Sequence, residues 1–261
     1  MTDTSQDKVL VEKQGAITTV TINRPERRNA VDYETGEMLL AAFDAFDADD
    51  SQSVAILRSA GPSFCAGFDL KSLSGVEDLT YDPMAEGIMG PSRRLLNKPV
   101  IAAVEGFAVA GGLELALWCD LRVASRSASF GVFCRRWGVP LIDGGCVRLP
   151  RLIGHSRALD MILTGREVKA EEAYSFGLAN RLVDEGEAYA EAFKLAENLA
   201  EFPQVCMRTD RMTSYQQWGM DIDDALRLEA VEGAKPLMAE AQNGASRFAG
   251  GLGRGGDFSK I

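Results

Sequence analysis

Short apolar strands alternate with amphipathic helices through the first half of the chain, and this alternation limits the fold more than any other feature. In residues 8–22 (KVLVEKQGAITTVTI), apolar and polar residues alternate on both sides of a glycine, which predicts a β-hairpin. Residues 33–50 predict a helix, because apolar side chains recur along one stripe at helical spacing. Further short strands are predicted at residues 53–61, 98–106 and 119–125. Strands separated by helices favour an α/β fold with parallel crossovers.

The second half of the chain is predicted to be mostly helical from about residue 143. Its apolar residues recur with a period of about 3.6, which is typical of helices that bury one face. We also expect two regions, a core over residues 1–200 and a C-terminal helical region over residues 201–261.

Composition and charge exclude several classes of protein. With 46% hydrophobic and 25% charged residues, the chain has the composition of an ordinary globular domain. A net charge of −10 argues against nucleic acid as a partner, because phosphate contacts need clustered lysine and arginine. The polar N-terminus has no apolar stretch of the kind found in signal peptides, and no stretch of about 18 apolar residues predicts a membrane span. We expect a cytoplasmic protein.

Cysteine and histidine usage argues against metal and redox sites. The five cysteines include no C-x-x-C pair, so neither a zinc ribbon nor a dithiol motif is indicated. The single histidine, His155, precedes a predicted helix and leaves no set of histidines for a metal. We expect no metal site.

Two glycine-containing segments each follow a predicted strand, residues 61–73 (GPSFCAGFDLKSL) and 106–120 (GFAVAGGLELALWCD). Glycine allows a close backbone approach, and N–H groups at the start of a helix are free to bind a ligand. Two such amides directed at one carbonyl oxygen would form an oxyanion hole. The second segment also places a carboxylate, Glu114, in an apolar run, where burial would raise its pKa.

Three blocks of the sequence resemble the crotonase superfamily, also called the enoyl-CoA hydratase/isomerase family. These blocks are residues 64–73 (FCAGFDLKSL), 104–121 (VEGFAVAGGLELALWCDL) and 130–183, which begins FGVFCRRWGVPLIDGG. The resemblance implies a spiral of ββα turns followed by C-terminal helices that build a homotrimer or a dimer of trimers. It also implies an acyl-CoA thioester as substrate, with no metal or redox cofactor.

The resemblance also implies roles for individual residues. The two oxyanion amides fall on Phe68 and Gly111, which would hold the thioester oxygen as it becomes an enolate. Lys71 is placed where it can meet a phosphate of coenzyme A, although a solvated surface lysine is an equally good interpretation. The residues expected along the coenzyme A nucleotide are Arg28, Ala30, Ala66, Asp69 and Lys71.

Family hydratases are similar in using two glutamates, one to activate water and one to deliver a proton. The first matches Glu114. The second should lie four residues before Gly138, where this chain has Cys134. A thiol with an ordinary pKa of about 8.5 cannot replace that carboxylate at neutral pH. A lowered pKa would make Cys134 a weak base, and otherwise it is apolar filling.

Asp143 is a further candidate for proton transfer. It follows Gly138 by five residues, one residue beyond the position of a functional aspartate in the similar dienoyl-CoA isomerases and 4-chlorobenzoyl-CoA dehalogenase. An N-cap of the following helix would be a sufficient structural explanation for Asp143. The resemblance therefore implies an enzyme of the enoyl-CoA hydratase/isomerase type, with double-bond isomerisation as reasonable as hydration. A protein that binds acyl-CoA without turnover is the alternative.

Overall fold

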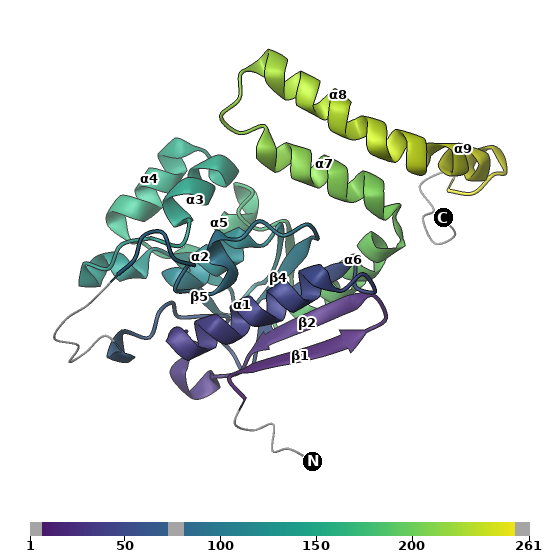
Figure 1. Ribbon diagram of the computed structural model, residues 1–261. Coiled ribbons are helices and arrows are strands. Elements are labelled where there is room, and N and C mark those ends of the chain that lie inside the picture. Colours follow the sequence, from purple (N-terminus) through teal and green to yellow (C-terminus); the bar gives the residue numbers. More distant parts are fainter. Residues whose placement is uncertain (1–6, 73–80, 254–261) are drawn as a thin grey trace.

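The chain forms a twisted sheet of mainly parallel strands with helices on both faces, as seen in a computed structural model that describes residues 7–72 and 81–253 (Figure 1). The sheet has the order β1-β2-β3-β4-β6-β9. Its strands are β1 (Val9–Gln14), β2 (Ile17–Ile22), β3 (Val54–Ser59), β4 (Val100–Val104), β6 (Leu121–Ser125) and β9 (Arg181–Val183). The first pair is antiparallel and the other pairs are parallel, so the predicted hairpin and the predicted α/β fold are confirmed.

A second sheet runs beside the first and has the order β5-β7-β8. Its strands are β5 (Phe107–Val109), β7 (Ser129–Gly131) and β8 (Val168–Lys169). Strand β5 follows β4 after two residues, and β7 follows β6 after three, so successive turns of the chain add one strand to each sheet. Helix α2 (Gly111–Trp118) follows directly after β5. This strand, strand and helix sequence is the ββα turn expected for a spiral.

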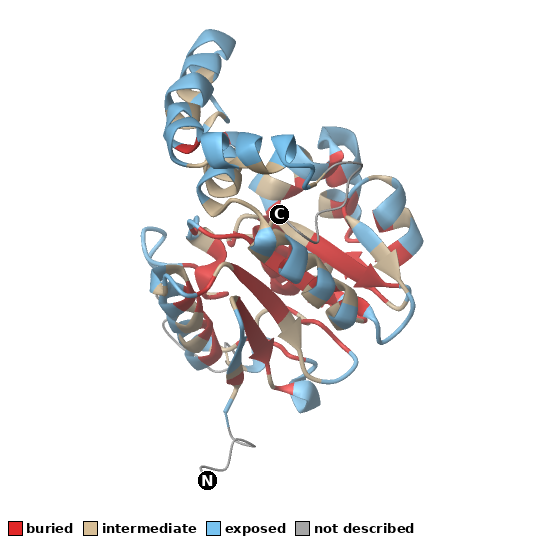
Figure 2. Ribbon diagram, turned by 90° about the vertical axis from the view of Figure 1, so that its right-hand side faces the viewer, coloured by how far each residue is buried: buried red, intermediate tan, exposed pale blue. Residues whose placement is uncertain are grey.

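Strands β2, β3 and β4 in the main sheet are buried on both faces, as is typical of parallel strands covered by helices (Figure 2). Helix α1 (Tyr33–Ala48) covers one face, and the side chains of Ala55 and Leu57 in β3 lie in the core on its side. Helix α6 (Ala188–Glu201) covers the other face, where Val54 and Ile56 point. The alternation along β3 therefore divides its residues between the two layers.

The remaining helices confirm the prediction that the chain is mostly helical after residue 143. They are α3 (Gly145–Ile153), α4 (His155–Thr164), α5 (Ala170–Ser175), α7 (Gln204–Gln216), α8 (Ile222–Ala239) and α9 (Ala241–Ala249). Helix α7 is joined to the core by Arg211, whose guanidinium is 2.7 Å from Asp120. Helices α8 and α9 reach away from the sheet (Figure 1). The division at residue 200 stays a prediction, and its outer ends, residues 1–6 and 254–261, lie outside the described residues.

None of the helices within residues 7–72 and 81–253 combines the length and the apolar character needed to cross a membrane.

A buried arginine fixes the end of α2. Arg122 is 1% exposed and donates to the carbonyl oxygens of Leu178 at 2.6 Å and Cys119 at 2.8 Å. It also donates to Asn180 Oδ1 at 3.2 Å. The carbonyl of Cys119 belongs to the C-terminal cap of α2, where a positive charge is favourable. Arg122 therefore holds the helix that begins at Gly111.

We expect Arg122→Leu to lower the free energy of unfolding by about 3 kcal/mol, because several buried acceptors lose their donor. Urea denaturation followed by circular dichroism measures this change. Arg126→Leu is the matched control, because Arg126 is half exposed and forms surface ion pairs with Glu171 and Asp184. Its removal should cost less than about 1 kcal/mol. Equal losses in the two variants would contradict the anchoring role of Arg122.

Candidate active site

The N-terminus of α2 presents a free backbone amide at Gly111. As the first residue of the helix, Gly111 has no intrahelical acceptor for its N–H, which donates to none of the described residues. The preceding residue, Ala110, has a φ of 54° and a ψ of −125°, an unusual conformation for a residue with a side chain. A Cβ atom on Gly112 would lie 2.1 Å from the carbonyl oxygen of Cys65, so this close approach requires glycine.

A second free amide, that of Phe68, lies beside the first. Cys65 pairs with β5, because its N–H donates to Phe107 O at 2.8 Å and its carbonyl oxygen accepts from Val109 N–H at 3.0 Å. Gly67 has a φ of +98°, and a Cβ atom there would lie 3.0 Å from the Gly111 nitrogen. The Phe68 N–H, like that of Gly111, finds no acceptor among the described residues. The structure therefore brings the two predicted oxyanion amides to one place.

Glu114 lies one turn into α2 and is 2% exposed. Its Oε1 atom accepts hydrogen bonds from the backbone N–H groups of Asp143 and Gly145, both at 2.9 Å. No donor in the described residues reaches Oε2. Burial raises the pKa of Glu114 to about 7, with a further contribution from the negative charge of Asp143, while the two amides oppose the rise. Glu114 can therefore both hold and release a proton near neutral pH.

Cys134 lies in a short 3₁₀ helix (Phe133–Trp137) and is 7% exposed. Burial raises the pKa of its thiol, and the negative charge of Glu114 raises it further. The interpretation of Cys134 as a weak base with a lowered pKa is therefore wrong. Cys134 instead packs as an apolar side chain in the main core. It lies close enough to Glu114 for the carboxylate charge to affect the pKa of the thiol.

Asp143 is 1% exposed, and its carboxylate forms no capping hydrogen bond with α3. Its Oδ1 atom accepts hydrogen bonds from Met89 N–H at 3.3 Å and from the Ser92 hydroxyl. The N-cap interpretation is wrong, because Gly144, with a φ of 99°, takes the cap position and no side chain caps the helix. Asp143 instead meets Glu114 through its backbone N–H.

Three residues near Glu114 carry no signal in the sequence. Met89 is 1% exposed and packs on Gly111, where a Cβ atom would lie 2.7 Å from the Met89 sulfur. Ser92 and Arg148 both bond to Asp143. Met89 and Ser92 lie 54 and 51 residues before Asp143, a separation that no spacing pattern connects. Arg148 follows Asp143 by only five residues, but no sequence motif pairs them.

The segments expected to bind coenzyme A also come together. The Ala66 N–H donates to the carbonyl oxygen of Arg28 at 3.1 Å, which joins the 64–73 block to the 27–30 segment. Arg28 is exposed, whereas Ala30 is 8% exposed, and its carbonyl oxygen accepts from Arg24. Arg24 is a buried residue that sequence reasoning missed, since it is one of several arginines in one polar stretch.

Asp69 and Lys71 have different surroundings. The Asp69 carboxylate lies 3.3 Å from Arg24, which also pairs with Asp32 at 2.9 Å. Asp69 is therefore occupied in holding the segment together. Lys71 is exposed, and no described carboxylate forms an ion pair with it.

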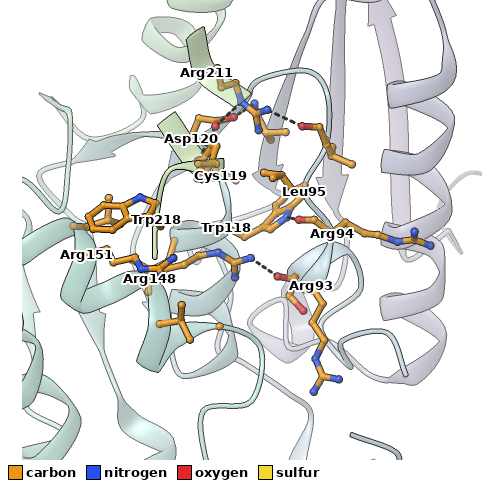
Figure 3. A pocket seen from close by; sticks show the side chains of 18 residues that line it. Arg93, Arg94, Leu95, Trp118, Cys119, Asp120, Arg148, Arg151, Arg211 and Trp218 are labelled. Atoms are coloured by element: carbon orange, nitrogen blue, oxygen red, sulfur yellow. Dashed lines mark hydrogen bonds and ion pairs between the residues drawn. The ribbon is translucent and has the colours of Figure 1, made fainter. Parts of the chain in front are cut away.

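A pocket of about 440 Å³ lies at the other end of α2 (Figure 3). Trp118, Asp120 and Arg211 line it, together with Trp218 and Arg151, which stack at 5.0 Å. Because α2 rises about 1.5 Å per residue, Trp118 lies about 10 Å from Gly111 along the axis. Ser92, Gly144 and Arg148 line this pocket, whereas Phe68, Gly111 and Glu114 are not among its lining residues.

Comparisons with known proteins identify the family of this chain. The family described as enoyl-CoA hydratase/isomerase matches residues 12–248. Enoyl-CoA hydratase EchA19 of Mycobacterium tuberculosis is 36% identical over 92% of both chains, and a short-chain-enoyl-CoA hydratase of Clostridium acetobutylicum is 35% identical over 92% of this chain and 93% of its own. The crystal structure of enoyl-CoA hydratase EchA1 from Mycobacterium marinum has a TM-score of 0.86 and 36% identity, covering 93% of this chain and 95% of its own. The chain therefore belongs to the enoyl-CoA hydratase/isomerase family.

Proposed function

We propose that this enzyme of the enoyl-CoA hydratase/isomerase type holds an acyl-CoA thioester with its carbonyl oxygen between the amides of Phe68 and Gly111. Negative charge gathers on that oxygen when a proton leaves C2, and two preorganised donors stabilise it. Glu114 carries the proton. The observation that supports this role most directly is its buried carboxyl, with a pKa of about 7, one turn from the Gly111 amide.

A single carboxyl is sufficient for double-bond isomerisation. Glu114 would take the proton from C2 of a 3-enoyl thioester, and the double bond would shift to C2 as the same proton is delivered to C4. Hydration additionally needs a group that activates water, and the Cys134 thiol stays protonated because its pKa is raised. Cys134 therefore favours isomerisation over efficient hydration. The acid–base role of Asp143 stays a prediction, since its Oδ1 atom is bonded to Ser92 and Met89.

Coenzyme A would lie along the backbone of Arg28, Ala30 and Ala66, with exposed Lys71 beside a phosphate. Asp69 would act indirectly, because it is paired with Arg24. This chemistry requires no metal or redox cofactor, which stays a prediction, as does the cytoplasmic location.

Self-association through the C-terminal helices is part of the proposal. Helix α8 exposes apolar side chains that a monomer would leave in water, including Ile222 at 71%, Val231 at 69% and Met238 at 85%. Exposed apolar surface of this extent favours burial against another copy. A homotrimer or a dimer of trimers stays the expected assembly.

Turnover and binding assays test the proposed chemistry. Purified protein is incubated with short and long 2-enoyl-CoA and 3-enoyl-CoA, following the conjugated thioester absorbance, while calorimetry measures binding. Gly67→Ala should lower turnover about 30-fold, less than the loss of a whole oxyanion donor, because its Cβ atom would press on the Gly111 amide. The affinity of the Gly67→Ala protein for free coenzyme A, which lacks the acyl oxygen, should equal that of wild type.

Gly177→Ala is the control for backbone strain, because Gly177 has a φ of +82° but no atom within 4 Å of the added Cβ. Binding without turnover across all substrates would overturn the proposed chemistry in favour of an acyl-CoA-binding protein. Equal losses in the two glycine variants would remove the support for the oxyanion site.

A further inference from the structure

Two segments that are distant in sequence meet behind the site. The 87–92 segment passes close to the 141–145 loop, and Asp143 joins them. Its carboxylate accepts from the Ser92 hydroxyl and from Met89 N–H at 3.3 Å. Ser92 is completely buried and Asp143 is 1% exposed. This is a polar contact from which water is excluded, so its partners are costly to separate.

Arg148 connects the same two segments a second time. Reaching from α3, its guanidinium donates to the carbonyl oxygens of Asp143 at 3.0 Å and Ser92 at 2.7 Å. The neighbouring Arg93 adds a hydrogen bond to Ile142 O at 3.1 Å. Side chain and backbone of Asp143 are therefore both fixed.

Two glycines make this close packing possible. A Cβ atom on Gly87 would lie 1.9 Å from the Ser92 hydroxyl oxygen and 2.3 Å from Asp143 Oδ1. A Cβ atom on Gly144 would lie 2.1 Å from the Arg148 guanidinium. Glycine at both positions allows the three polar groups to close on one another.

The cluster of Ser92, Asp143 and Arg148 acts on Glu114 in two ways. The N–H groups of Asp143 and Gly145 hold its Oε1 atom at 2.9 Å, so fixing Asp143 also fixes the carboxyl orientation. The charged groups around Glu114 are Asp143, which raises its pKa, and Arg148, which lowers it. Cys134 on the 3₁₀ helix is the other titratable neighbour, and its thiol is uncharged at neutral pH.

We propose that Asp143 is a positioning residue for Glu114, fixed by Ser92 and Arg148, which orients the glutamate through its backbone N–H and places one negative charge beside it without touching the thioester. The proposal rests on the proposed function only where it gives Glu114 the proton-transfer role. It assigns the buried aspartate a role other than the proton transfer predicted for it from sequence.

Asp143→Asn tests the effect of the charge. Asparagine keeps the acceptor for Ser92 and the backbone N–H for Glu114, but it removes the negative charge. An infrared titration of the carboxyl band, assigned with Glu114→Gln, measures Glu114 without any substrate. We expect its midpoint to fall by about one pH unit, because the ionised form no longer faces a like charge. In a pH–rate profile, the apparent pKa that reports Glu114 should fall by the same amount.

Arg148→Gln should shift the midpoint of the Glu114 titration in the opposite direction, upward, because a positive charge near the carboxylate is lost. Arg148→Lys, which keeps the charge, should bring the midpoint back towards the wild-type value. These variants keep the proposal testable if Asp143→Asn does not fold. Asp184→Asn is the control, with an aspartate side chain that is 86% exposed on the surface. An unchanged or raised midpoint in folded Asp143→Asn overturns the proposal, as does an unchanged or lowered midpoint in folded Arg148→Gln. Because the titration needs no substrate, an inactive enzyme would contradict the proposed function alone.

Discussion

Glu114→Gln is expected to lower turnover of enoyl-CoA substrates about 10³-fold, the scale of a lost general acid or base. Glutamine has the same shape and keeps an oxygen that accepts from Asp143 and Gly145 N–H, so the loop around it stays in place. It cannot exchange a proton. Steady-state kinetics measure the turnover, and calorimetry should show an affinity for coenzyme A within about twofold of wild type, well under 1 kcal/mol.

The same substitution has a pH-dependent effect on stability. In the folded protein the pKa of Glu114 is raised to about 7, so folding favours the protonated form. The stabilising contribution is fully present below the ordinary glutamate pKa of about 4.3 and is lost as the pH rises through 7. We therefore expect the free energy of unfolding of Glu114→Gln to rise by about 3 kcal/mol relative to that of wild type between pH 4 and pH 8. Urea denaturation at both pH values measures the difference.

The two measurements separate a catalytic from a structural glutamate. If Glu114→Gln loses turnover and also gains stability at high pH, the carboxyl of Glu114 has a catalytic role in proton transfer and does not stabilise the fold. Surviving turnover would show that Glu114 is structural, and the proton-transfer role would pass to Asp143. A stability difference that does not change with pH would contradict the raised pKa.

The fold and the centre of the site were predictable because they depend on local patterns. The period of two over 8–22 and the helical period over 33–50 reflect burial of one face, and β1, β2 and α1 form there. Gly67 and Gly112 lie at close backbone approaches, where a side chain would collide, so glycine at these positions is visible in the sequence. A carboxylate in an apolar helix has few explanations, so Glu114 was also identifiable.

The support around the site was not predictable, because it consists of contacts between distant segments. Asp143 resembles an N-cap when only the following residues are considered, yet its carboxylate bonds to Ser92, 51 positions earlier. Arg24 is one of several arginines in a polar stretch, and only the fold brings it to Asp69. Hydrogen bonds of this kind need no spacing or periodicity in the sequence.

Cys134→Glu is expected to raise the rate of 2-enoyl-CoA hydration about 10²-fold, because it supplies the second carboxyl that water activation lacks. The native thiol cannot serve, since burial and the charge of Glu114 raise its pKa. Two carboxyls in one buried site hold a proton between them, so one can act as base while the other is an acid. The decrease in conjugated thioester absorbance measures hydration.

Cys134→Gln is the matched control for this prediction, because it adds the same volume and polarity without an ionisable group. The rate should rise in Cys134→Glu alone, while isomerisation of 3-enoyl-CoA, which needs only Glu114, changes less in both variants. Thermal melting establishes that each variant folds, since Cys134 is only 7% exposed and a larger polar side chain strains its surroundings. A folded Cys134→Glu protein that hydrates no faster than Cys134→Gln would mean that position 134 does not reach the attacking water. Hydration in this chain would then have to depend on Glu114 alone.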